Sequence, residues 1–110
     1  MNQSTAPKVA IIMPAYNASE FIEASVRSIL AQSFKDICLI VVDDGSRDDT
    51  AAILGRIAAE DSRLKPVTTA NAGPAMARNH GLSLVDPGTE YIMFADADDE
   101  LRQEIGRAHV

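Results

Sequence analysis

The sequence predicts an α/β fold, a mostly parallel sheet of about four strands with helices packed on it. Two observations support this prediction. Short apolar runs alternate with amphipathic stretches in the order β-α-β-α-β-α-β, and the polar residues suited to chemistry follow directly after the apolar runs. Strands joined by helical crossovers run parallel, so their carboxyl ends should meet at one edge of the sheet, where α/β proteins bind ligands.

The composition is that of one small folded domain. The 110 residues are 46% hydrophobic and 24% charged, which leaves room for a single core. A net charge of −6 argues against a nucleic-acid partner, because binding a polyanion requires a basic surface. The single cysteine, Cys38, excludes an internal disulfide framework and a multi-cysteine zinc site. Neither a transmembrane run nor a signal-peptide pattern is present. We therefore expect a cytoplasmic protein, or a parent protein at the cytoplasmic face of the membrane.

The first strand and helix are predicted from residues 9–32. Residues 9–13 form a continuous apolar run closed by Pro14, which is typical of a strand buried on both faces. Asn17 and Glu20 have the spacing of a capping box, so Asn17 is the predicted N-cap of a helix that ends near Gln32. The apolar stripe of this helix is Ile22, Val26, Ile29 and Leu30.

The second strand and helix follow the same pattern. Residues 37–42 are apolar and rich in β-branched side chains, which favours a second strand. Asp48 or Asp49 can cap a second helix, and Gly55 inside it costs ~1 kcal/mol relative to alanine. The apolar stripe of this helix is Ile53, Leu54, Ile57 and Ala58.

The last three elements are shorter. Residues 64–69 predict a short third strand, and Gly73 followed by Pro74 opens a third helix, since proline suits the first helical turn. Residues 91–95 predict a fourth strand, which this chain would leave as an unprotected apolar sheet edge.

Three carboxylates follow the fourth strand within four residues, at Asp96, Asp98 and Asp99. Such crowding is unfavourable unless a cation or solvent neutralises it. Alternate residues at a strand end can aim Asp96 and Asp98 to one side, where Mg²⁺ would take these carboxylates together with phosphate oxygens. The alternative is a solvated acidic loop that caps a following helix.

Two further acidic residues, Asp43 and Asp44, end the second strand. A carboxylate there can accept hydrogen bonds from a ribose hydroxyl or a base N–H, as in dinucleotide-binding folds. The alternative is an Asp-Gly turn at Asp44 and Gly45 that leads to a helix capped by Asp48. Both interpretations can hold at once.

The start of the third helix is a candidate phosphate site. Free N–H groups and the helix dipole favour a phosphate near Gly73, and Arg78 can add a charge-assisted contact. The alternative is an ordinary Gly-Pro helix start with a surface arginine. The dinucleotide fingerprint GxGxxG and the P-loop motif are both absent from the sequence.

Together these stretches resemble the family 2 glycosyltransferases, inverting enzymes with the GT-A fold that use nucleotide-diphosphate sugars. The resemblance covers roughly residues 8–102 and implies the Rossmann-like, nucleotide-binding half of that fold. Five motifs appear in the family's order and approximate spacing. They are VAIIMPAYN (residues 9–17), SILAQS (28–33), IVVDDGS (40–46), NAGPAMARN (71–79) and YIMFADADD (91–99).

The resemblance also implies a ligand set. The donor would be a nucleotide-diphosphate sugar, by family habit a UDP-sugar, for transfer to an acceptor hydroxyl. Asp96 and Asp98 match the DxD signature, whose last Asp is the usual direct ligand of Mg²⁺ or Mn²⁺ on the diphosphate. With the phosphate site above, the candidate nucleotide-binding residues are Pro14, Ala15, Tyr16, Asp43, Asp44, Gly73, Arg78 and Asp96.

The end of the chain predicts an incomplete domain. Family members continue beyond DxD to a general-base carboxylate, whereas this sequence stops eleven residues after Asp99. No residue present matches that base, so we assign no catalytic residue and expect donor binding without transfer. Residues 105–110 back-translate, with a stop codon following, into a common sequencing-library adapter, so they are either a non-native tail or an ordinary helix end. Residues 1–104 would then be the N-terminal, nucleotide-sugar-binding part.

Two other classes of protein remain as alternatives. A receiver-like regulatory module requires an acidic pair after its first strand, whereas this strand ends in Pro-Ala-Tyr-Asn. A nucleotidyltransferase usually has a glycine-rich basic loop at the same place, and none is present.

Overall fold

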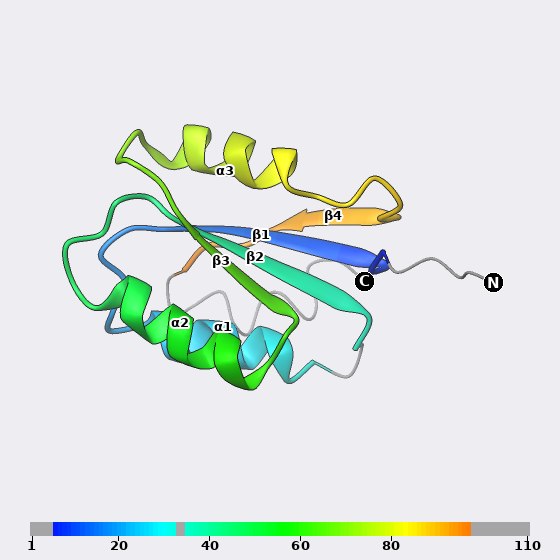
Figure 1. The fold of residues 1–110 in the computed structure, drawn as a ribbon, viewed down its shortest axis with the longest axis horizontal. Coiled ribbons are helices and arrows are strands. Elements are labelled where there is room, and N and C mark those ends of the chain that lie inside the picture. Colours follow the sequence, from blue (N-terminus) through cyan, green and yellow to red (C-terminus); the bar gives the residue numbers. More distant parts are fainter. Residues whose placement is uncertain (1–5, 33–34, 98–110) are drawn as a thin grey trace.

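Within residues 6–32 and 35–97, which this computed structural model describes, four strands form one sheet. The strands are β1 (Val9–Ala15), β2 (Ile37–Asp43), β3 (Leu64–Thr68) and β4 (Tyr91–Phe94). The helices are α1 (Ile22–Leu30), α2 (Thr50–Glu60) and α3 (Pro74–Ser83). The sheet order is β3-β2-β1-β4, with every neighbouring pair parallel (Figure 1). The predicted fold class and element order are confirmed.

Helices cover both faces of this sheet. Figure 1 shows α1 and α2 on one face and α3 on the other. Because successive side chains of a strand point to opposite faces, β2 supplies residues to both cores. The larger core, under α1 and α2, includes Met13, Ile22, Val26, Ile29, Leu39, Val41, Leu54 and Ile57. The smaller core, under α3, consists of Ile40, Val42 and Ala77.

Strand β1 continues through Pro14, so the predicted end of this strand at residue 13 is wrong. The pairing of β1 with β4 ends at Ile12 and Phe94. Pro14 lies two residues after Ile12, whose carbonyl accepts a hydrogen bond from the Ala95 N–H on the β4 side. The nitrogen of Pro14 therefore faces the β4 side beyond the last pair, where its missing N–H removes no ladder hydrogen bond.

Asn17 does not cap α1, and the capping-box prediction is wrong. Helix α1 begins at Ile22 with Phe21 as its N-cap, and no side chain caps it. Asn17 has a φ of 50°, in the left-handed region that asparagine tolerates. Its Oδ1 instead accepts a hydrogen bond from the Arg47 N–H at 2.8 Å. This hydrogen bond joins residues thirty positions apart and takes the place of the predicted capping bond at the start of α1.

Both residues predicted as possible caps, Asp48 and Asp49, lie at the start of α2, and each has a different role there. Asp49 holds the N-cap position without a side-chain hydrogen bond. Asp48 Oδ1 accepts from the Thr50 N–H at 3.0 Å and from Thr50 Oγ1 at 2.6 Å. These bonds lower the pKa of the Asp48 carboxyl to about 2.

Gly55 offers a stabilising substitution in α2. It is exposed within the helix, and a Cβ added there meets no other atom within 4 Å. We expect Gly55→Ala to raise the free energy of unfolding by about 0.5–1 kcal/mol, because alanine loses less backbone entropy on folding. Urea denaturation of the two chains measures this change. An unchanged or lower stability would contradict the free space around residue 55.

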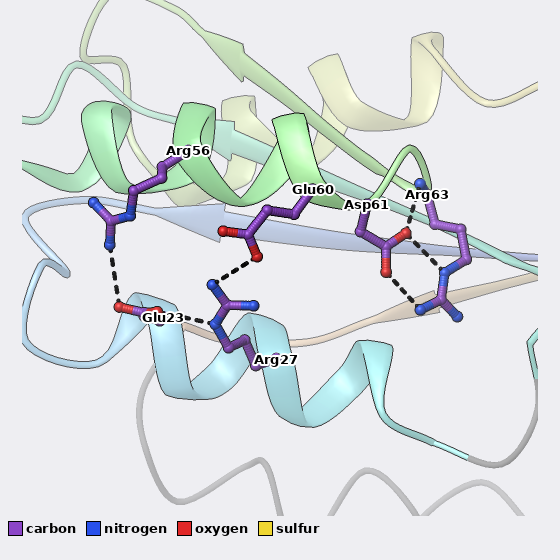
Figure 2. A network of polar contacts seen from close by, with 6 residues as sticks. All are labelled: Glu23, Arg27, Arg56, Glu60, Asp61 and Arg63. Carbon is purple, nitrogen blue, oxygen red and sulfur yellow. Dashed lines mark hydrogen bonds and ion pairs between the residues drawn. The ribbon is translucent and has the colours of Figure 1, made fainter.

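Two groups of ion pairs lie on the α1 and α2 side of the molecule, one between α1 and α2 and one in the turn from α2 to β3 (Figure 2). Glu23 and Arg27 form an i,i+4 pair at 2.9 Å, which Arg56 and Glu60 extend between the helices. The Arg27 guanidinium lowers the pKa of the Glu23 carboxyl. These side chains are about half exposed, so we expect little net stabilisation from them.

The second group is the pair between Asp61 and Arg63 at the start of β3 (Figure 2). Arg63 donates from Nε and Nη2 to the two Asp61 oxygens at 3.0 and 2.7 Å. Arg63 Nη2 also donates to the Leu30 carbonyl at 2.9 Å, which ties the end of α1 to β3. The Arg63 hydrogen bonds lower the pKa of the Asp61 carboxyl to about 2.

Asp61 therefore predicts a pH dependence of stability. Its pKa is lower in the folded chain than the ordinary value of 3.8, so its contribution is complete above pH 3.8 and is lost as the pH falls through about 2. We expect Asp61→Asn to lower the free energy of unfolding above pH 4, with a difference from wild type that shrinks toward pH 2. Urea denaturation at several pH values measures this difference in the free energy of unfolding. A difference that does not change with pH would contradict the lowered pKa of Asp61.

Strand β4 pairs with β1 only, and no other strand of the described residues lies beside it. Tyr91, Ile92 and Phe94 are all exposed on it. The predicted apolar sheet edge is thus present in the part of the chain that the structure covers. None of the helices in that part is long and apolar enough to span a membrane.

Candidate functional site

The segments that follow β1, β2 and β4 meet at the carboxyl edge of the sheet, together with the start of α3. They surround a hollow of about 150 Å³. It is lined by Pro14, Ala15, Tyr16, Asp44, Pro74 and Asp96. A neighbouring hollow of about 300 Å³ shares Pro14, Tyr16 and Asp96 and adds Asn17, Ala18, Phe21 and Ala97. Five of the predicted nucleotide-binding residues therefore line one space.

The loop after β1 is fixed to the loop after β2. The Asn17 N–H donates to Ser46 Oγ at 2.8 Å, and Asn17 Oδ1 accepts from the Arg47 N–H in return. The Ala18 N–H donates to the buried Thr50 Oγ1 at 2.9 Å. These bonds hold Tyr16 at the rim of the hollow, where its side chain is 49% exposed. An exposed aromatic held by its backbone is suited to stack on a planar base.

Asp44 connects the loop after β2 to the loop before α3. Its Oδ1 accepts from the Ala72 N–H at 2.8 Å, and its Oδ2 accepts from the Gly73 N–H at 3.0 Å. Gly73 is the N-cap of α3, with a φ of 100°. The Gly73 N–H, one of the backbone groups near the predicted phosphate position, is therefore occupied by Asp44.

Asp43 is buried beneath these loops at the end of β2. It is 1% exposed, and its Oδ1 accepts from the Ser46 N–H at 3.1 Å. Its Oδ2 has no hydrogen-bond partner among the described residues. A buried carboxylate oxygen without a donor is costly, and such an atom indicates that a further donor belongs there.

Arg78 and Asp96 approach each other across the site. Arg78 Nη2 lies 3.9 Å from Asp96 Oδ1, which brings α3 beside the segment after β4. Both side chains are substantially exposed, so the pair is loose and each group remains available to a ligand. The structure thus places a cation and a carboxylate at the mouth of the hollow.

Of the predicted metal pair, the structure describes Asp96, and Asp98 lies outside the described residues. Asp96 is an exposed carboxylate beside the hollow, which fits a hard cation that takes one or two protein oxygens and completes its shell with phosphate oxygens. Within residues 6–32 and 35–97, no three or more His, Cys, Asp or Glu side chains gather closely enough to hold a metal ion.

Pro74, Phe21 and Asn17 line these hollows but are not among the predicted nucleotide-binding residues. Pro74 had a signal in the sequence, because the first turn of a helix that begins at the ligand edge must lie near the ligand. Phe21 had none, since the sequence places it inside the first helix. The position of Asn17 depends on its partners in the loop after β2, which the local sequence does not reveal.

A larger cavity of about 520 Å³ lies away from this edge, on the sheet face beside α3. Cys38 lines it, together with Ala10, Ile40 and Leu84. Burial raises the pKa of the Cys38 thiol, which keeps it protonated at neutral pH. No predicted site residue lines this cavity.

The chain is similar to known proteins over most of its length. The family model described as Glycosyl transferase family 2 matches residues 10–105. An uncharacterized glycosyltransferase from Haemophilus influenzae is 44% identical over 94 residues, covering 84% of this chain and 37% of the relative.

Two solved structures are also similar. TarS residues 1–349 from S. aureus, in complex with UDP-GlcNAc, superposes with a TM-score of 0.75 at 28% identity, covering 92% of this chain and 30% of that one. The mannosyltransferase PcManGT from Pyrobaculum calidifontis, in complex with GDP-Man and Mn²⁺, gives a TM-score of 0.67 at 30% identity, covering 76% and 26%.

The match to the family model extends over most of this chain, whereas the chain spans only 14–38% of the length of the curated relatives. The family of the chain follows from the match, together with the parallel sheet and the loops at its carboxyl edge. The receiver-like and nucleotidyltransferase alternatives are set aside on the same grounds. This chain belongs to glycosyl transferase family 2.

Proposed function

We propose that the whole protein transfers a sugar from a nucleotide-diphosphate sugar to an acceptor hydroxyl with inversion, and that the residues described here bind the nucleotide part of the donor. The observation that carries this proposal is the shared hollow at the carboxyl edge of the sheet. An exposed aromatic, Tyr16, lies at its rim, and Arg78 and Asp96 lie at its mouth. These groups are suited to a base, a diphosphate and a cation.

The donor that we propose is a UDP-sugar. TarS binds UDP-GlcNAc and PcManGT binds GDP-Man, so both similar structures hold a nucleotide-diphosphate sugar. We assign the face of the base to Tyr16 and the base N–H or ribose O–H to the acidic pair at the end of β2, of which Asp44 lines the hollow and Asp43 has a buried oxygen without a donor. Direct contact with Asp43 requires a local movement, because it is 1% exposed.

We propose a divalent cation, Mg²⁺ or Mn²⁺, as the cofactor. PcManGT was solved with Mn²⁺, and Asp96 offers an exposed carboxylate beside the hollow. Asp96 and Asp98 would hold the cation. When bound, it neutralises charge that develops on the departing nucleoside diphosphate. The chain's own contribution is to orient the base at Tyr16 and to place Arg78 beside the phosphates.

The test compares two tyrosines at opposite edges of the sheet. Tyr16 lies at the carboxyl edge, and Tyr91 is 58% exposed at the amino end of β4. We expect Tyr16→Ala to weaken UDP binding about tenfold, since stacking of one base contributes roughly 1–3 kcal/mol, and Tyr91→Ala to leave it unchanged. Isothermal calorimetry with UDP, GDP and ADP, each with Mn²⁺, measures both the site and the preference for uridine.

Three outcomes would count against the proposal. Absence of binding of any nucleotide by the folded chain would contradict the nucleotide site. Equal losses in Tyr16→Ala and Tyr91→Ala would contradict its location. Tighter binding of GDP than of UDP would contradict the UDP-sugar donor and leave the site in place.

A further inference from the structure

The loop after β1 is bound by side chains that lie just before α2 and at its first residue. Three consecutive N–H groups of this loop, those of residues 17–19, each donate to one of these side chains. The acceptors are Ser46 Oγ at 2.8 Å, Thr50 Oγ1 at 2.9 Å and Asp48 Oδ2 at 3.1 Å. The position of the loop therefore depends on residues about thirty positions further along the chain.

Thr50 differs from the other two acceptors because its side chain is fully buried, whereas Ser46 is partly exposed and Asp48 is exposed. Its hydroxyl accepts from the Ala18 N–H and donates to Asp48 Oδ1 at 2.6 Å, so it is bonded in both directions. A hydrogen bond is stronger inside a protein than in water, and a buried N–H that loses its acceptor is costly. Thr50 therefore fixes Ala18 more firmly than the exposed side chains fix their neighbours.

Tyr16 lies between two fixed points of the backbone. On one side, Ala15 is the last residue of β1, and its carbonyl accepts from the Asp44 N–H at 2.8 Å. On the other side, Ala18 is bound to Thr50, and its carbonyl accepts from two N–H groups at the start of α1 at 2.9 and 2.7 Å. Loss of the Thr50 hydroxyl would release the second point and allow the exposed Tyr16 ring to leave the rim of the hollow.

We infer that Thr50 is a positioning residue for the base of the nucleotide: its hydroxyl fixes the backbone at Ala18 and thereby holds the Tyr16 ring where the base binds. Thr50 acts through the loop and not by contact, because it is 0% exposed and lines neither of the two hollows at the carboxyl edge. The inference rests on the proposed function, in which Tyr16 stacks on the base. It gives the first residue of α2 a role in binding in addition to its place in the helix.

The experiment is a double-mutant cycle in the 110-residue chain. Calorimetry with UDP and Mn²⁺ is carried out on wild type, Thr50→Val, Tyr16→Ala and the double variant, each shown to be folded by circular dichroism. Valine matches threonine in shape but lacks the hydroxyl. We expect Thr50→Val to weaken UDP binding about fivefold, which is less than the loss expected of Tyr16→Ala, and to have little further effect in the Tyr16→Ala background.

Two control variants accompany the cycle. Thr50→Ser keeps the hydroxyl and should bind UDP as wild type does. Thr89→Val is the matched control, since it removes a buried hydroxyl between α3 and β4, at the larger cavity away from the carboxyl edge. Thr89 Oγ1 has no hydrogen-bond partner among the described residues, so this variant should also bind UDP as wild type does.

The outcomes separate this inference from the proposed function. An equal loss in both backgrounds would show that Thr50 acts by a route other than Tyr16 and would overturn the inference alone. Unchanged affinity in folded Thr50→Val would do the same, because a merely structural role changes stability without changing UDP affinity. A loss in Thr50→Ser or Thr89→Val as large as that in Thr50→Val would also overturn it. A wild-type chain that binds no UDP would overturn the proposed function and this inference with it.

A second measurement, on the wild-type chain, remains if Thr50→Val does not fold. Relaxation of ¹⁵N should show the amides of residues 16–18 to be as rigid as those of β1, because their backbone is fixed on both sides. The Ala18 N–H should exchange slowly with solvent, since its acceptor is the buried Thr50 hydroxyl. Flexible amides at residues 16–18, or rapid exchange at Ala18, would overturn the inference.

Discussion

Mn²⁺ is expected to tighten the binding of UDP to this chain at least about tenfold, and Asp98→Ala to abolish that gain. The chain carries a net charge of −6, and the carboxylate of Asp96 lies at the mouth of the hollow. Without a cation these charges repel a diphosphate, and with one they attract it. Calorimetric titration of UDP with Mn²⁺ and with EDTA measures the difference.

The control for this prediction is Asp86→Ala. It is the same substitution at an exposed carboxylate in the loop between α3 and β4, near the amino end of β4. UDP binding by this variant should depend on Mn²⁺ as that of wild type does. Binding that is equally tight with EDTA would contradict a metal-bridged diphosphate, and a full Mn²⁺ effect in Asp98→Ala would remove that residue from the ligand set.

Gly81→Ala is expected to destabilise the chain by about 1–3 kcal/mol, which is the usual cost of forcing one methyl group into a packed core. Gly81 is buried where α3 crosses the sheet. A Cβ there would lie 2.6 Å from Ile12 Cγ2 and 3.4 Å from Val42 Cγ2. Ile12 is fully buried and β-branched, so its methyl group cannot rotate away easily. Helix α3 must therefore move outward, and Arg78 with it.

Urea denaturation tests this prediction, with Gly55→Ala as the matched control. The same substitution in α2 is expected to stabilise the chain, so the two substitutions should change the free energy of unfolding in opposite directions. In the Ile12→Ala background the clash disappears, and Gly81→Ala should cost less there than in wild type. An unchanged stability in Gly81→Ala would contradict the close packing of α3 on β1.

The sequence predicted those features that depend on local pattern. Apolar runs identified β1, β2 and β4, and apolar stripes identified α1 and α2, because burial on one or both faces fixes the spacing of apolar side chains. Helix α3 was predicted from Gly73 and Pro74 at its start. The crossover rule then placed Tyr16, Asp44 and Asp96 at one edge, as the structure has them.

The features that it missed depend on partners far away in the chain. Asn17 has the spacing of an N-cap, yet its side chain bonds to the backbone of Arg47. Asp43 and Asp44 are adjacent and chemically identical, and only the arrival of residues 71–73 beside Asp44 distinguishes them. Pro14 continues a strand because its missing N–H falls beyond the last pair with β4. No local pattern carries that information.

The most direct test of the nucleotide site is an NMR titration of the ¹⁵N-labelled chain with UDP and Mg²⁺, which is diamagnetic. We predict that the largest shifts of backbone amide signals fall on residues 15–17, 43–46, 71–78 and 95–97, around the hollow at the carboxyl edge. Shifts centred on Cys38, Lys65 and Leu84, which line the larger cavity beside α3, would contradict the account, as would unchanged signals at saturating UDP.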